Sequence, residues 1–158
     1  MANFQPAKSK LTIGSLEPEG RDLFVRAQYN PKELQIDKPV SWVDHRELSV
    51  EYQGRSPRTT TLELLFDGFE DRTFHVQDQL DLLDHLASPR SINSPEAAMR
   101  RPHRCVIVWG QRGVPALRCV IESLTVKYTM FDSDGVPFRA TATVKLREFA
   151  VIRDRGEA

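Results

Sequence analysis

The 158-residue chain has little cysteine: Cys105 and Cys119 are its only two. Two thiols are too few for a disulfide framework or for a zinc site of their own. They flank a turn predicted at residues 110–113, so a hairpin centred on Arg112 would place them opposite each other. A cross-strand disulfide is then sterically conceivable, although a reducing cytoplasm favours two buried thiols.

The sequence also lacks net charge, because 22 basic residues balance 22 acidic ones. A general nucleic-acid binder needs a net basic face to release counterions from phosphate, so no nucleic-acid partner is expected. The longest apolar stretch, Cys105–Trp109, is far too short to cross a bilayer, and the polar start of the chain lacks a signal peptide's apolar run. We therefore expect no membrane contact and assembly in the cytoplasm.

Recognisable catalytic motifs are missing as well. No catalytic nucleophile motif surrounds either cysteine. None includes any of the four histidines, which are His45, His75, His85 and His103. Three aspartates share one face of the predicted helix, which a solvated surface explains more simply than a calcium site: Asp78, Asp81 and Asp84. The expectation is a protein that is no enzyme and holds neither a metal nor a cofactor.

What remains is an ordinary globular composition, with 40% hydrophobic and 28% charged residues. A chain of this length fits one core. We divide it into a leader (residues 1–10), one β-rich domain (11–149) and a charged tail (150–158).

Alternation of apolar and polar residues predicts most of the domain to be β-structure. The strands are expected at residues 11–13, 23–29, 48–52, 59–66, 105–109, 116–131 and 138–146, with a hairpin turn at 132–135. One helix is predicted at 76–87, where Val76, Leu80, Leu83 and Ala87 repeat at helical spacing. The expected fold class is mainly β: a small antiparallel β-barrel or sandwich with a flanking helix.

Two regions are candidates for contact with a partner. Residues 32–58 form a long excursion with weak periodicity, and long loops in compact domains are usually functional or mobile. The last strand presents threonine and basic residues on the face opposite the core, which suits solvent or a neighbouring subunit better than phosphate. The predicted interface residues are Trp42, Asp44, His45, Arg46, Arg55, Arg139, Lys145 and Arg147.

Six local segments, in order, carry a family resemblance. They are VRAQYNP (25–31), LELLFD (62–67), RP leading into VIVWG (101–110), VIESL (120–124), YTMF (128–131) and GVPFRA (135–140). Together they resemble the tube-type proteins of contractile injection systems, in particular the baseplate adaptors that join the spike to the inner tube. The resemblance covers about residues 20–148.

The resemblance implies a phage tail-tube-like fold that closes into a six-membered ring. The implied partners are further copies of the chain, the inner-tube protein, the spike protein and other baseplate subunits, in a phage-tail-like particle that is released or membrane-attached. Larger members of this branch carry a glycan-binding LysM module; none follows the domain in this sequence, so peptidoglycan binding is not expected.

Three alternatives stay open at this point. The first alternative is an inner-tube subunit of the same machine. The second is a monomeric ligand-binding β-barrel with an internal pocket, and the third is an enzyme. The last would need a cleft that joins His45 or His103 to carboxylates.

Overall fold

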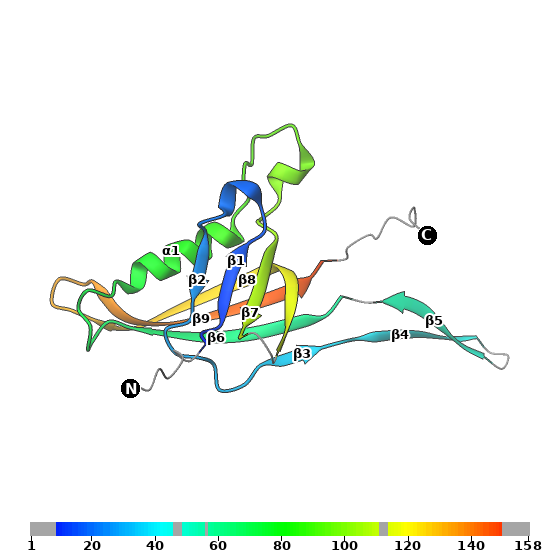
Figure 1. The fold of residues 1–158 in the computed structure, drawn as a ribbon, viewed down its shortest axis with the longest axis horizontal. Helices are drawn as coiled ribbons and strands as arrows, with labels where there is room; N and C mark the ends of the chain where they lie inside the picture. Colours follow the sequence, from blue (N-terminus) through cyan, green and yellow to red (C-terminus); the bar gives the residue numbers. More distant parts are fainter. Residues whose placement is uncertain (1–8, 46–48, 56, 111–113, 150–158) are drawn as a thin grey trace, which may run out of the picture.

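The computed structural model describes residues 9–45, 49–55, 57–110 and 114–149. Nine strands and one helix make up most of this part of the chain (Figure 1). Seven strands form one antiparallel sheet in the order β2-β1-β7-β8-β9-β6-β3, and β4 and β5 form a separate pair. The elements are β1 (Thr12–Ser15), β2 (Phe24–Arg26), β3 (Gln35–Asp37), β4 (Val40–His45), β5 (Ser49–Arg55), β6 (Thr59–Asp67), α1 (Val76–Ala87), β7 (Cys105–Trp109), β8 (Val114–Phe131) and β9 (Pro137–Glu148).

The mainly β fold with one helix is confirmed, but a closed barrel is wrong. The described strands run from β2 at one edge to β3 at the other, and these two edges do not pair. Closure requires the edge strands to share a ladder. Here each edge strand has only three residues and is paired on its inner side alone.

Long strands β6, β8 and β9 are the framework of the sheet. Alternation predicted β9 correctly: Ala140, Ala142, Val144 and Leu146 are fully buried, and the residues between them lie on the other face. The predicted hairpin turn is also confirmed. Gly135 adopts a φ of 78°, which glycine accepts without strain, and the Asp132 carboxylate accepts hydrogen bonds from the Val136 and Asp134 N–H groups.

Helix α1 covers one face of the sheet and packs against β8, β9, β2 and β6. Its buried stripe is Val76, Leu80, Leu83 and Leu86. The prediction placed Ala87 on this stripe, with Leu82 and Leu86 widening it; Leu86 is fully buried, while Leu82 and Ala87 are partly buried and pack against the core. The small side chains of Ala140 and Ala142 on β9 let the helix approach the sheet closely.

The excursion at 32–58 is more ordered than predicted. It contains β3 and the β4–β5 hairpin, which extends away from the main sheet at one end of the molecule (Figure 1). Because this hairpin pairs only with itself, its strands did not need the strong alternation that a core-facing strand shows. The predicted leader and tail fall almost wholly outside the described residues, since only residues 9 and 10 of the leader are described.

The two cysteines stand directly opposite each other on β7 and β8, as predicted. Both are free and fully buried. Burial raises the pKa of each thiol to about 12, so the reactive thiolate is suppressed at neutral pH. They act as small apolar core residues.

Candidate assembly interface

One broad face of the sheet is left uncovered by the described residues. It is the face of β6, β8 and β9 opposite α1, and the exposed side chains on it are mainly polar. The outward positions include Thr61, Glu63, Leu65, Thr125, Lys127, Arg139, Thr141, Thr143, Lys145 and Arg147. We call it the bare face, because no described element packs on it. Such a face can contact another chain or line a solvent-filled channel.

The basic stripe on this face is balanced by carboxylates. Arg139 pairs with Asp67 at 2.8 Å, while Lys145 and Arg147 approach Glu122 at 3.8 and 3.5 Å. Burial alone would raise the pKa of Asp67, but the Phe69 N–H and the Arg139 guanidinium outweigh it and lower the pKa. Three cations thus face two carboxylates, so the stripe keeps only a small positive charge.

The predicted interface residues separate into two groups. Arg139, Lys145 and Arg147 lie together on β9. Four others lie on the backbone of the separate hairpin, which does not pair with β9: Trp42, Asp44 and His45 on β4, and Arg55 on β5. Arg46 lies outside the described residues. A common interface of all eight stays a prediction.

Both edges of the seven-stranded sheet are open within the described part of the chain. At β2, the Ser15 N–H donates to Leu23 and the Ala27 N–H donates to Leu11. The backbone groups of the alternate residues, Phe24 and Arg26, therefore point away from β1. Such groups are a template for pairing with a strand of another chain.

A cluster of charged side chains, which the sequence did not predict, lies just past the C-terminal end of β1. Glu17 is 3% exposed, and its carboxylate accepts hydrogen bonds from Arg101 at 2.7 Å and from Arg104 at 2.9 Å. Arg90 lies 3.6 Å away. Hydrogen bonds from Arg104 are the main cause that lowers the pKa of Glu17 to about 2, against the opposing effect of burial. The cluster ties the connector after α1 to the start of the chain.

His103, which the enzyme alternative named, lies beside this cluster. Its Nδ1 lies 2.8 Å from the Ser15 hydroxyl, which also accepts a hydrogen bond from the Glu17 N–H. The imidazole is 3% exposed, and burial, followed by the nearby His85 and Arg90, lowers its pKa. The Ser15–His103 contact joins residues 88 positions apart. A hollow beside it is lined by His103 and by Glu19 and Asp22, while the carboxylate of Glu17 is held by arginines.

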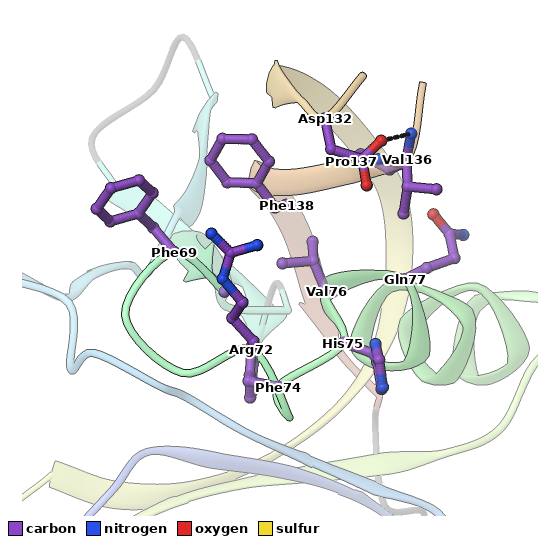
Figure 2. A pocket seen from close by; sticks show the side chains of 11 residues that line it. Phe69, Arg72, Phe74, His75, Val76, Gln77, Asp132, Val136, Pro137 and Phe138 are labelled. Carbon is purple, nitrogen blue, oxygen red and sulfur yellow. Dashed lines mark hydrogen bonds between the residues drawn. The ribbon is translucent and has the colours of Figure 1, made fainter. Parts of the chain in front are cut away.

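An aromatic hollow lies at the other end of the sheet, between the β6–α1 connection and the β8–β9 turn. Its volume is about 340 Å³. Figure 2 shows Phe69 and Phe138 on one side, with Arg72 near them and Val76 further in. The rings of Phe69 and Phe138 lie 6.1 Å apart. Two loops that are distant in sequence form this hollow, so no local sequence pattern predicted it.

Among residues 9–45, 49–55, 57–110 and 114–149, no three or more His, Cys, Asp or Glu side chains gather as metal ligands would. Within the same residues, no helix combines the length and apolar character that a bilayer span requires.

A helix-backed sheet with a bare face, and with edges that pair with no other described strand, leaves surface available for contact with other chains. Comparison with known families specifies the class further. Residues 8–155 match the family described as contractile injection system tube protein, and the chain belongs to this family. The family supports a structural role in such a machine and assembly with its other subunits. A comparison with curated proteins found no match.

Proposed function

We propose that this protein is a ring-forming subunit of the baseplate, where it joins the spike to the inner tube of a contractile injection system. The observation that carries the proposal is the bare face of β6, β8 and β9, because a tube subunit needs one polar sheet face free of its own core. Family membership supports the same role.

The open edges supply a way to close the ring. If the β2 edge of one copy meets the β3 edge of the next, the contact is heterologous, and a rotation that closes generates a ring. The sheets then continue around the ring with α1 outside and the bare face inside. A channel lined by threonines and paired charges presents no strong charge of one sign to what passes through it.

The adaptor position and the inner-tube position differ in what the chain binds. An adaptor ring has unlike neighbours above and below, whereas an inner-tube subunit stacks on copies of itself. The segments that resemble the adaptor branch favour the first, and we take a six-membered ring from the same resemblance.

The test is the native mass of the purified chain by light scattering, alone and with the tube and spike proteins. A ring of six that forms alone or on addition of a partner supports the adaptor proposal. Long self-stacked tubes without any partner support the inner-tube position instead. A monomer that ignores both partners contradicts an assembly role.

We expect Arg26→Pro to block ring formation without unfolding the subunit. Proline removes an N–H that points to the open side of β2, while the bonds between β2 and β1 come from the alternate residues. Light scattering should report a monomer, and circular dichroism should report an unchanged fold. Arg26→Ala is the matched control, because it removes the same exposed side chain but keeps the N–H. Equal ring formation by both variants would show that β2 is not a ring edge.

A further inference from the structure

The aromatic hollow at the β8–β9 turn has an apolar wall and a rim with one group of each charge. Phe69 is 60% exposed and Val136 is 54% exposed. The Arg72 guanidinium has no hydrogen bond or ion pair with another described residue. On the opposite side of the rim lies the Asp132 carboxylate (Figure 2).

These features suit a short peptide segment. An exposed ring, Phe69, beside the half-buried rings of Phe74 and Phe138 on a concave surface indicates a contact site more often than an isolated apolar residue does. A volume of about 340 Å³ lies near the lower end of ligand pockets, which span about 300–1,000 Å³, and so admits a few side chains. A guanidinium that pairs with no described residue adds, at the rim, a preference for a carboxylate close to the apolar anchor.

The chain contains one segment of matching chemistry directly after β9. Val151 and Ile152 are an apolar pair, followed by Arg153 and Asp154. We propose that the hollow receives residues 151–154 of a neighbouring copy of this chain. The apolar pair packs against the aromatic wall, Asp154 pairs with Arg72, and Arg153 pairs with Asp132.

The same molecule cannot supply this segment. The hollow includes Pro137 and Phe138 at the start of β9, while the segment follows the end of that strand. Twelve residues of β9 place its ends about 37 Å apart. Residues 151–154 lie three to six positions beyond Glu148, so they extend only about 20 Å from it.

A copy placed end to end satisfies the geometry. The hollow lies at one end of the long strands and β9 ends at the other, so the end of one copy faces the hollow of the next (Figure 1). This inference rests on the assembly role and describes a contact between copies stacked along the strand direction, as in the inner-tube position, rather than between neighbours within one ring. It concerns a contact separate from the β2 and β3 edges.

A labelled peptide of residues 149–158 tests the contact by fluorescence anisotropy. The acceptor is the full chain with Ile152→Asp, because its own segment then cannot fill the hollow of a neighbour. We expect saturable binding of the unaltered peptide. A peptide with Ile152→Asp should bind at least about tenfold more weakly, since a buried isoleucine contributes roughly 1.5–3 kcal/mol.

A charge exchange identifies the site on the acceptor. Adding Arg72→Glu to it should weaken the unaltered peptide about two- to fivefold, and a peptide with Asp154→Arg should recover the loss. No binding at millimolar peptide would overturn the proposal. Binding that ignores Arg72→Glu, or that the exchange fails to recover, would do the same by placing the peptide elsewhere.

The ring mass separates this contact from the proposed function. Arg72 lies in the β6–α1 connection and belongs to neither edge strand, so the Arg72→Glu chain should still form rings. Rings without peptide binding refute the docking segment alone. Failure of every chain to form rings, with or without partners, refutes the proposed function.

Discussion

Replacing Glu17 with glutamine should lower the free energy of unfolding by about 3 kcal/mol, which matches the difference between its ordinary pKa of 4.5 and its pKa of about 2. Glutamine keeps the size of the side chain but not the charge that holds Arg90, Arg101 and Arg104 together. The Arg90 side chain is only 8% exposed and would keep the Glu19 carboxylate and the Ala98 carbonyl oxygen as partners. Urea unfolding monitored by circular dichroism measures the loss.

The pH dependence of stability is a second readout of the same group. The folded-state pKa is lower than the unfolded one, so the stabilising contribution is complete above pH 4.5 and is lost as the pH falls toward about 2. The unmodified chain should lose stability steeply across this window. The Glu17→Gln chain should lose less there, because that carboxylate no longer takes up a proton.

Glu63→Gln is the matched control. Glu63 lies exposed on the bare face of β6, so the same change of charge should leave unfolding nearly unchanged. If Glu17→Gln and Glu63→Gln have equal effects, or if Glu17→Gln leaves the pH profile as it was, the cluster does not stabilise the fold.

Local patterns predicted those parts of the fold that depend on neighbouring residues. Strand β9 alternates strictly because one of its faces is core, and α1 shows helical spacing because one of its sides is buried. The opposed cysteines followed from the position of a single turn. In each case the physical cause lies within about a dozen residues.

Features that depend on distant pairing were not predictable in this way. Whether the sheet closes depends on the outer sides of β2 and β3, which pair with no other described strand. The stripe of Arg139, Lys145 and Arg147 was foreseen, but its carboxylate partners lie on other strands, and only the register brings them close. The cluster around Glu17 joins residues more than 70 positions apart.

The largest loss of stability is expected for Phe66→Ala. Phe66 is fully buried on β6, faces the small Ala140 of β9 across the ladder, and stacks on Phe74 with 6.4 Å between ring centroids. With only an alanine opposite, the neighbouring strand has no long side chain to fill the space. The cavity should therefore persist and cost about 3–5 kcal/mol in urea unfolding.

Leu65→Ala is the control for this change, because Leu65 is the next residue on the same strand but is 40% exposed on the bare face. It should cost much less, and a similar cost for both would mean that the core does not lie on the α1 side. Phe74 also lines the aromatic hollow, so removal of the ring beneath it should weaken binding of the 149–158 peptide as well. Weaker peptide binding by the Phe66→Ala chain would show that core packing supports the contact between copies. The reason is that a displaced Phe74 ring could no longer pack against the apolar pair of the peptide.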